Sequence, residues 1–318
     1  MKNIIGVDIG GTNVKLGVVS QEGKILSQLS IKTDIKRDYK HVFRDISDAA
    51  SDCVKKANFR MSDISGMGLG IPGTVDNVKG EVIYANNLGW KNVPVRGELL
   101  KYFNFPVVMS NDANCAAMGE MLFGSAKGLQ NVVLLTLGTG VGAGFIVNGK
   151  MIEGNYGAGA EGGHTLLIKG GEECTCGRRG CIEAYVSATA LIRDTKRAML
   201  KDKSSVMWRA VNNDIESVSG RTAFECGKKN DITALKVVNN YIENLAEAII
   251  SFINIFRPDV VLLGGGVSAE KDYLFKPLQE YADKYIYAAG IVPPVPIKTC
   301  SLGNDAGLLG AAALLIEN

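Results

Sequence analysis

The sequence contains no long uncharged hydrophobic segment and no marked excess of charge of either sign. No run approaches the ~20 consecutive apolar residues that a transmembrane helix requires, so we expect no membrane association. The net charge of +2 gives no field strong enough to predict binding to nucleic acid or to an anionic membrane. The first residues, M-K-N-I-I-G-V-D, already have the pattern of a strand and leave no room for a signal peptide. We therefore expect a cytoplasmic protein.

Histidine is scarce and cysteine is unevenly spread: the chain has two histidines and seven cysteines. Cys174, Cys176 and Cys181 fall within C-T-C-G-R-R-G-C, and His164 precedes them in E-G-G-H. Three thiolates and an imidazole are the ligand set of a structural zinc, which leaves no position open for water. The alternatives are ordinary buried thiols with a core histidine, or a disulfide, but reduced thiols suit a cytosolic protein better. The pattern predicts a zinc site that holds a loop rigid, and with it the flanking Glu161 and Glu183.

The composition is that of an ordinary globular protein, with 46% hydrophobic and 21% charged residues. A length of 318 residues suggests about two domains, each able to bury a core. No low-complexity linker separates them, so we expect the chain to cross between the domains more than once.

Two similar glycine turns organise the chain. Residues 4–19 predict a strand, the turn Gly10-Gly11-Thr12 and a second strand, and residues 133–147 repeat this pattern around Gly138-Thr139-Gly140. Backbone N–H groups of such turns can point at phosphate. An internal repeat predicts two lobes of the same topology across a cleft, although two unrelated hairpins are the alternative. A third turn, Gly264-Gly265-Gly266, favours either an adenosine site or a simple helix-entry loop.

Polar residues stand at several expected element ends. Asp8 ends the first strand, and Asp112 lies in S-N-D-A-N, where a strand over 106–109 should meet a helix. A catalytic carboxylate is common at such a junction, but taken alone the position favours a helix cap. Y-A-N-N-L-G-W at 84–90 suits either hydroxyl recognition or a plain turn. The remaining expected elements are a strand over 25–31, helices over 39–58, 94–102, 232–256 and 305–316, and an edge strand within 293–299.

Together the motifs resemble those of the ROK family (repressor, open reading frame, kinase), and most closely its bacterial glucokinases. The resemblance covers the whole chain. It rests on D-I-G-G-T-N at Asp8, G-I-P-G-T-V-D at Gly70, N-L-G-W at Asn87, N-D-A-N at Asn111, L-G-T-G-V-G at Leu137, E-G-G-H at Glu161, C-T-C-G-R-R-G-C-I-E at Cys174 and L-G-G-G-V-S at Leu263.

The resemblance implies an α/β fold of the actin-like ATPase (ribonuclease H-like) type, with two lobes and an interlobe cleft. We expect a small lobe of residues 1–118 plus 302–318 and a large lobe of residues 119–301 that carries the zinc site. The implied activity is ATP-dependent phosphorylation of the 6-hydroxyl of glucose in carbohydrate metabolism. Fructose, mannose, allose and N-acetylmannosamine remain alternative substrates. A homodimer is expected by the same resemblance.

The resemblance also implies roles for individual residues. Asp112 would be the general base, and an exposed carboxylate with an ordinary pKa would suffice, because the alcohol's proton departs late. Asp8 would orient hydrated Mg²⁺. The sugar hydroxyls would bind to Gly73, Asn87, Asn111, Glu161, His164 and Glu183. The nucleotide would contact Gly10, Gly11, Thr12, Asn13, Gly138, Thr139, Gly140, Gly264, Gly265 and Gly266, and the zinc ligands would be His164, Cys174, Cys176 and Cys181.

Two positions depart from the family pattern: Ala160 stands where glycine is usual, and Gly162 where an apolar residue is common. Both adjoin Glu161 and leave the sugar preference open. A sugar-responsive repressor would carry a DNA-binding helix-turn-helix before the first strand, and Met1 stands only a few residues ahead of that strand. A non-catalytic sugar-binding module would not need Asp112 together with phosphate-binding turns.

Overall fold

The computed structural model describes residues 3–316 and divides into two compact units. The first unit comprises Met1–Leu134, Gly144–Ala160 and Cys300–Asn318, and the second comprises Leu135–Ala143 and Glu161–Thr299. The chain therefore passes between the units at more than one point, as the sequence predicted. The predicted lobe boundaries, 1–118 plus 302–318 and 119–301, stay a prediction.

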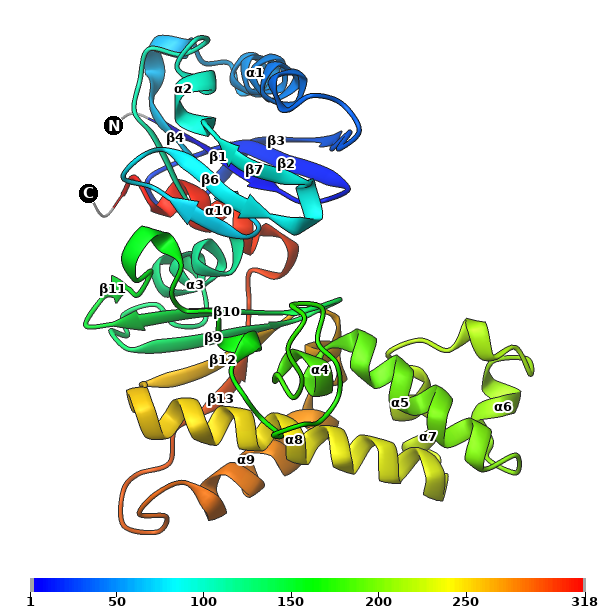
Figure 1. Ribbon diagram of the computed structural model, residues 1–318. Coiled ribbons are helices and arrows are strands. Elements are labelled where there is room, and N and C mark those ends of the chain that lie inside the picture. The colour runs from blue at the N-terminus through cyan, green and yellow to red at the C-terminus, as the bar shows by residue number, and fades with distance from the viewer. Residues whose placement is uncertain (1–2, 317–318) are drawn as a thin grey trace. The chain divides into compact units, whose positions relative to one another are not determined.

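The first unit is built on a five-stranded sheet in the order β3-β2-β1-β4-β8 (Figure 1). Its strands are β1 (Asn3–Ile9), β2 (Asn13–Val19), β3 (Ile25–Lys32), β4 (Ile64–Ile71) and β8 (Val107–Asn111). The first three form an antiparallel meander, and β1, β4 and β8 run parallel. Its helices are α1 (Tyr39–Lys56), α2 (Val95–Leu99), α3 (Asp112–Phe123) and α10 (Ala306–Ala313).

Strand β1 buries a different layer of side chains on each face, because successive residues of a strand point to opposite sides. Ile5, Val7 and Ile9 join the cluster that contains the buried face of α1, whereas Ile4 joins a second cluster with residues of α10. Gly6 lies on the α10 side, where a Cβ atom would come within 2.3 Å of the Leu308 carbonyl oxygen. Asp8 is on this same side, and a Cβ atom on Gly307 of α10 would be 2.6 Å from its carboxylate oxygen Oδ2, so α10 packs closely against the carboxylate.

A second, three-stranded sheet in the first unit has the order β5-β6-β7. Its strands are β5 (Thr74–Asp76), β6 (Glu81–Ala85) and β7 (Trp90–Val93). The sequence predicted no sheet here, and the stretch 84–90 was interpreted only as hydroxyl recognition or a plain turn, because Asn86, Asn87 and Gly89 are turn-forming residues. Asn86–Leu88 is a single 3₁₀ turn within it.

The other five-stranded sheet has the strand order β11-β10-β9-β12-β13, which repeats the order of the first five-stranded sheet. Its strands are β9 (Val132–Leu137), β10 (Val141–Val147), β11 (Lys150–Met151), β12 (Val260–Gly264) and β13 (Ile297–Thr299). The boundary between the units falls within β9 and β10. The predicted internal repeat is therefore confirmed as a repeat of topology, and β13 is at the sheet edge as expected.

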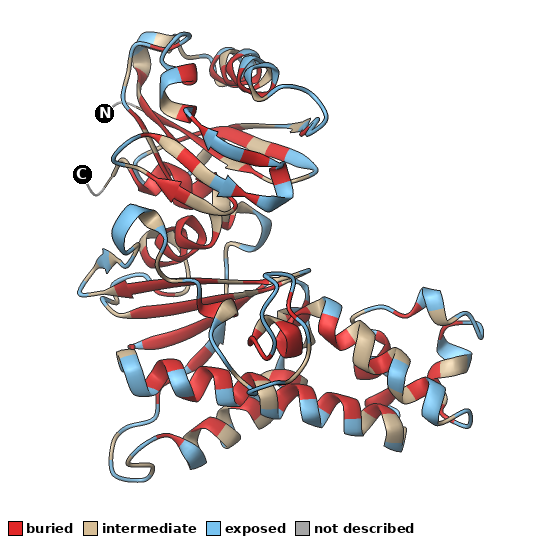
Figure 2. Ribbon diagram, viewed as in Figure 1, coloured by how far each residue is buried: buried red, intermediate tan, exposed pale blue. Residues whose placement is uncertain are grey.

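Helices make up much of the second unit: α4 (Glu183–Val186), α5 (Ala188–Lys201), α6 (Met207–Ala210), α7 (Thr222–Gly227), α8 (Ile232–Phe256) and α9 (Asp272–Tyr285). Helix α8 has the predicted bounds. The Asp231 side chain caps it by accepting from the Ala234 N–H, and Arg257 ends it in a left-handed conformation. One face of α8 is buried and the other exposed (Figure 2), as expected of its apolar stripe.

Candidate active site

Parallel strands of the first unit bring acidic side chains to one edge of its sheet. Asp8 in β1 is paired in register with Gly70 in β4, and Gly70 is paired with Ser110 in β8. Asp112 follows two residues later as the first residue of α3. Because the carboxyl ends of parallel strands share one sheet edge, Asp8 and Asp112 lie at the same end of the unit. They are close enough for the charge of Asp112 to raise the pKa of Asp8.

The helix cap at this junction is Asn111 rather than Asp112. The Asn111 Oδ1 atom accepts from the backbone N–H groups of Ala113 (2.8 Å) and Asn114 (3.4 Å). Its Nδ2 atom donates to the Gly73 carbonyl oxygen at 3.0 Å, which ties β8 to the loop after β4. Gly73 has φ +95°, a left-handed conformation that favours glycine. Since Asn111 satisfies the cap, the Asp112 carboxylate is not required for it, although Asp112 Oδ1 accepts from the Ala113 N–H at 2.9 Å.

Both carboxyl groups have raised pKa values. Burial and, to a smaller extent, the negative charge of Asp112 raise the pKa of Asp8 to about 6 against the opposing effect of the Lys15 ammonium group. Burial also raises the pKa of Asp112, while the backbone N–H of Ala113 lowers it. The expectation of an exposed Asp112 with an ordinary pKa was therefore wrong. The side chain is partly buried because α3 begins directly at the sheet edge.

The first glycine turn is closed by its own backbone and by Thr33. The Gly10 N–H donates to the Asn13 carbonyl oxygen at 2.9 Å. The Thr33 hydroxyl donates to the Gly10 carbonyl oxygen at 2.7 Å, and the Thr33 N–H donates to the Thr12 carbonyl oxygen at 2.8 Å. These contacts occupy the carbonyl groups and leave Thr12 and Asn13 exposed.

Asn87 lies beside the first glycine turn. A Cβ atom on Gly11 would be 3.3 Å from the Asn87 carbonyl oxygen. The loop after β6 and the first glycine turn are therefore neighbours, although they are far apart in the sequence.

Lys15 is a residue of this site that the sequence reasoning missed. It pairs with Asp8 across the β1–β2 hairpin. Its ammonium group also donates to Asp305 Oδ1 at 2.5 Å and to the Asn304 carbonyl oxygen at 2.8 Å. The cross-strand position opposite Asp8 could have been read from the hairpin register, but the pairing with the segment before α10 could not.

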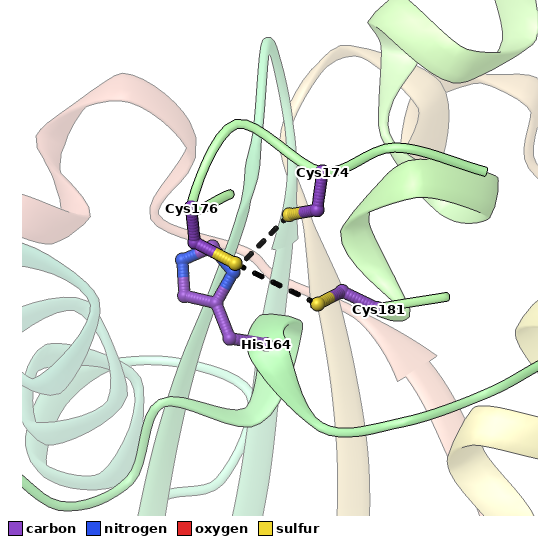
Figure 3. A group of neighbouring side chains, drawn as sticks. All are labelled: His164, Cys174, Cys176 and Cys181. Carbon is purple, nitrogen blue, oxygen red and sulfur yellow. Dashed lines mark hydrogen bonds between the residues drawn. The ribbon is translucent and has the colours of Figure 1, made fainter. Parts of the chain in front are cut away.

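The predicted metal ligands form one cluster in the second unit (Figure 3). The donor atoms of His164, Cys174, Cys176 and Cys181 all lie within 4.8 Å of one another. The Cys176 and Cys181 sulfur atoms are 3.7 Å apart, and the Cys174 sulfur is 3.5 Å from His164 Nδ1. At ordinary Zn–S and Zn–N lengths, a tetrahedral site spaces two sulfurs by about 3.8 Å and a sulfur and a nitrogen by about 3.5 Å. The donor set and its spacing therefore fit a four-coordinate zinc.

The thiols of this cluster titrate differently from one another. Burial raises the pKa of Cys174 to about 12 and also raises that of Cys181. The backbone N–H of Arg178 lowers the pKa of Cys176. Because a metal takes cysteine as thiolate, binding at this cluster releases protons and is favoured by rising pH.

Glu183 lies between this cluster and the second glycine turn. Its Oε1 atom accepts from the Thr175 hydroxyl at 2.7 Å and contacts the Cys174 sulfur at 3.5 Å. Its Oε2 atom accepts from the Val141 N–H at 3.0 Å. Both carboxylate oxygens of Glu183 are thus held by residues of the second unit, which orients the side chain.

The second glycine turn is closed like the first, by a Gly138 N–H that donates to the Gly140 carbonyl oxygen at 3.0 Å. Its other carbonyl groups accept from residues at the start of α5. The Ala188 N–H donates to Gly138 and the Thr189 hydroxyl donates to Thr139, each at 2.8 Å.

The third glycine turn packs against the end of β9. Gly265 has φ +84°, and a Cβ atom there would be 2.4 Å from the Leu137 carbonyl oxygen, so only glycine fits. A 3₁₀ helix over Gly266–Glu270 follows, and α9 begins at Asp272. The Gly138–Gly140 and Gly264–Gly266 turns therefore adjoin within the second unit.

Glu161 and His164 are neighbours in a 3₁₀ turn, where the His164 N–H donates to the Glu161 carbonyl oxygen at 3.0 Å. Ala160, directly before Glu161, has φ +63°, in the left-handed region that favours glycine.

The predicted site residues divide between the two units. The first unit contains Asp8, Gly10, Gly11, Thr12, Asn13, Gly73, Asn87, Asn111 and Asp112, and the second contains Gly138, Thr139, Gly140, Glu161, His164, Cys174, Cys176, Cys181, Glu183, Gly264, Gly265 and Gly266. Each unit thus supplies a glycine turn together with polar side chains. A site shared by both units, as the sequence predicted, stays a prediction.

The repeated sheet order, the glycine turns and the acidic sheet edge define an actin-like ATPase fold, and residues 4–318 match the model of the ROK family. The chain belongs to this family. A glucokinase of Thermotoga maritima is 35% identical over 99% of this chain and 97% of its own length. A glucokinase of Halalkalibacterium halodurans is 34% identical, over 98% of this chain and 94% of the relative. A ROK family glucokinase from Streptomyces griseus, solved in complex with glucose and AMPPNP, superposes with a TM-score of 0.81 at 31% identity and 98% coverage of both chains.

Within residues 3–316, no helix combines the length and apolar character needed to cross a bilayer.

Proposed function

We propose that this chain is an ATP-dependent glucokinase that transfers the γ-phosphoryl group of ATP to the 6-hydroxyl of glucose. The observation that carries this proposal is the match, over nearly the full length of both chains, to glucokinases and to a family member solved with glucose and AMPPNP. Phosphoryl transfer depends on positioning and charge neutralisation more than on covalent chemistry. The glycine turns at Gly10–Thr12 and Gly138–Gly140 suit the positioning of phosphates. Asp8 and Asp112 of the first unit suit the binding of Mg²⁺ and the acceptance of the proton.

Asp112 is the proposed general base. Burial raises its pKa, which brings the carboxylate nearer to the pH at which a base accepts a proton efficiently. Asn111 caps α3 and so leaves Asp112 oriented by the start of the helix rather than used as its cap. Asp8, at the same sheet edge, would orient hydrated Mg²⁺ against the phosphates.

The sugar hydroxyls would be held by Gly73, Asn87, Asn111, Glu161, His164 and Glu183. A site that bonds each hydroxyl rejects analogues that leave its polar groups unpaired. The nucleotide phosphates would bind to Gly10, Gly11, Thr12, Asn13, Gly138, Thr139 and Gly140, with the base near Gly264, Gly265 and Gly266.

A structural Zn²⁺ would be held by His164, Cys174, Cys176 and Cys181. With four protein ligands it would leave no place for water, so its contribution is to fix the loop that carries Glu161 and His164. We further propose a cytoplasmic homodimer, on the resemblance alone.

The test compares Asp112→Asn with Asp272→Asn, the same substitution at the first residue of α9. Asp112→Asn should lower sugar-dependent ADP formation at least ~10²-fold, the usual contribution of a general base, while glucose binding persists. Asp272→Asn should keep near-normal turnover. Near-normal turnover of Asp112→Asn would show that Asp112 is not the base.

The preferred hexose is tested with a panel of glucose, fructose, mannose, allose and N-acetylmannosamine, each assayed with ATP. The proposal expects the highest kcat/KM with glucose. A higher kcat/KM with another hexose would keep the class of enzyme and change the substrate.

A further inference from the structure

The Glu183 carboxylate connects the Cys/His cluster to the second glycine turn. Thr175, which lies between two cysteines of the cluster, donates its hydroxyl to Glu183 Oε1 at 2.7 Å. Val141, which directly follows the turn, donates its N–H to Glu183 Oε2 at 3.0 Å. We call the segment from His164 to Cys181, which carries the four predicted metal ligands, the ligand loop. The Glu183 side chain therefore spans from the ligand loop to the Gly138–Gly140 turn, and all of these residues lie within the second unit.

The ligand loop and the turn also approach each other closely on both sides of this bridge. A Cβ atom on Gly140 would be 2.5 Å from Glu183 Oε2. A Cβ atom on Gly163, next to the ligand His164, would be 2.2 Å from the Val141 carbonyl oxygen. Because packing this tight transmits displacement, a shift of the ligand loop must move the turn or break these contacts.

We propose that Glu183 couples metal binding at the Cys/His cluster to nucleotide binding at the Gly138–Gly140 turn. This rests on the proposed function, in which the cluster holds zinc and the turn holds the phosphates of ATP. Ordering of the ligand loop by the metal fixes the Thr175 hydroxyl, and Glu183 passes that constraint to the Val141 N–H at the end of the turn. Zinc would then support ATP affinity as well as the sugar site.

The bridge does not depend on the Cys174 thiol. Cys174 contacts Glu183 Oε1 at 3.5 Å, but a metal-bound thiolate has no proton to donate. The Thr175 hydroxyl carries no metal-binding role and can donate to Glu183 while the neighbouring thiols are bound to metal. Thr175 is therefore the positioning residue whose removal should uncouple the two sites.

Thermodynamic reciprocity supplies a readout that needs no turnover. If zinc raises nucleotide affinity, the nucleotide must raise zinc affinity by the same factor. Zinc affinity is measured by competition with a chelator, with and without a non-hydrolysable ATP analogue and Mg²⁺, in the absence of sugar. We expect the analogue to raise zinc affinity about 5–10-fold, the range of a moderate coupling. Thr175→Val should remove most of that increase. Equal zinc affinity with and without the analogue, or a protein that binds no zinc, would overturn the inference.

Two glycines of the same turn provide a matched pair. Gly140→Ala pushes directly on Glu183 Oε2, whereas a Cβ atom on Gly138 meets no atom within 4 Å. Gly140→Ala should weaken zinc binding about tenfold, roughly the effect of losing one charged hydrogen bond. Gly138→Ala should leave zinc affinity unchanged, whatever it does to catalysis. Equal zinc affinities of the two variants would refute a link through Glu183.

Sugar-dependent ADP formation is measured separately on the wild-type protein. If no hexose is phosphorylated but the analogue still raises zinc affinity, the proposed function fails and the coupling stands. If glucose is phosphorylated and the analogue does not change zinc affinity, the proposed function stands and only the proposed coupling is refuted.

Discussion

Replacement of Ala160 by glycine should stabilise the protein. Ala160 has φ +63°, a left-handed conformation that favours glycine. An L-residue in the left-handed region costs about 1–2 kcal/mol, while glycine loses about 0.5–1 kcal/mol through its greater freedom in the unfolded chain. The difference predicts a net gain of about 0.5–1 kcal/mol for Ala160→Gly. In a protein of this size, that corresponds to a rise in Tm of about 1–1.5 °C.

The control is Ala158→Gly, two residues earlier in the same segment. Ala158 has φ −98°, so no strain is relieved and only the entropy cost of glycine remains. Thermal unfolding followed by circular dichroism, at equal zinc content, should show Ala160→Gly above wild type and Ala158→Gly below it. Ala288, with φ +59°, gives an independent second case in which glycine should raise Tm. If Ala160→Gly lowers Tm as much as Ala158→Gly, the left-handed backbone at 160 carries no strain and the reasoning fails.

Three other substitutions test the site and its supports. Asp8 has a folded-state pKa of about 6 against an ordinary 3.8, so the folded protein binds this proton more tightly and loses stability as pH rises between these values. Without nucleotide and Mg²⁺, Asp8→Asn should therefore be more stable than wild type above pH ~6, by up to about 3 kcal/mol, and equal to it below pH ~4. Urea unfolding of both proteins at the two pH values checks this prediction. A stability difference that does not change with pH would contradict it. Cys176→Ser should lower both Tm and glucose affinity, measured by calorimetry, and an unchanged affinity in metal-free protein would show that the cluster does not organise the sugar site. Glu120 is fully buried and accepts from the Ser125 N–H (2.7 Å), the Leu302 N–H (2.8 Å) and the Ser301 hydroxyl (3.1 Å). Glu120→Gln should therefore lower the free energy of unfolding in urea by about 2–3 kcal/mol. A loss near zero would show that these hydrogen bonds to Glu120 do not stabilise the fold.

The sequence predicted those parts of the fold whose signals are local. Alternating apolar residues around Gly10 and Gly138 marked both hairpins, and the helix predicted over 232–256 has the bounds of α8. The Cys/His cluster was found because its ligands lie close together in sequence.

Features that depend on distant contacts could not be predicted in this way. The strands β5, β6 and β7 have three, five and four residues, too few to show a clear alternation of apolar side chains, so only their pairing with one another identifies them as a sheet. The ion pair between Lys15 and Asp305 joins residues 290 positions apart. The raised pKa of Asp112 depends on burial, which no residue type at positions 110–114 indicates.

The metal cluster lies on a loop with little regular secondary structure. The segment from Thr165 to Ile182 has two isolated bridges, Leu166 with Cys181 and Glu173 with Arg179, and several backbone hydrogen bonds within turns. Leu166 and Ile168 are 46% and 42% exposed, so hydrophobic burial contributes little to its conformation. Free energy of metal binding is then available as folding free energy for this segment alone. A cross-link through four side chains would add to these contacts and help to hold Glu161, His164 and Glu183 in hydrogen-bonding geometry. This is why loss of zinc should disorder the sugar ligands while leaving both sheets folded.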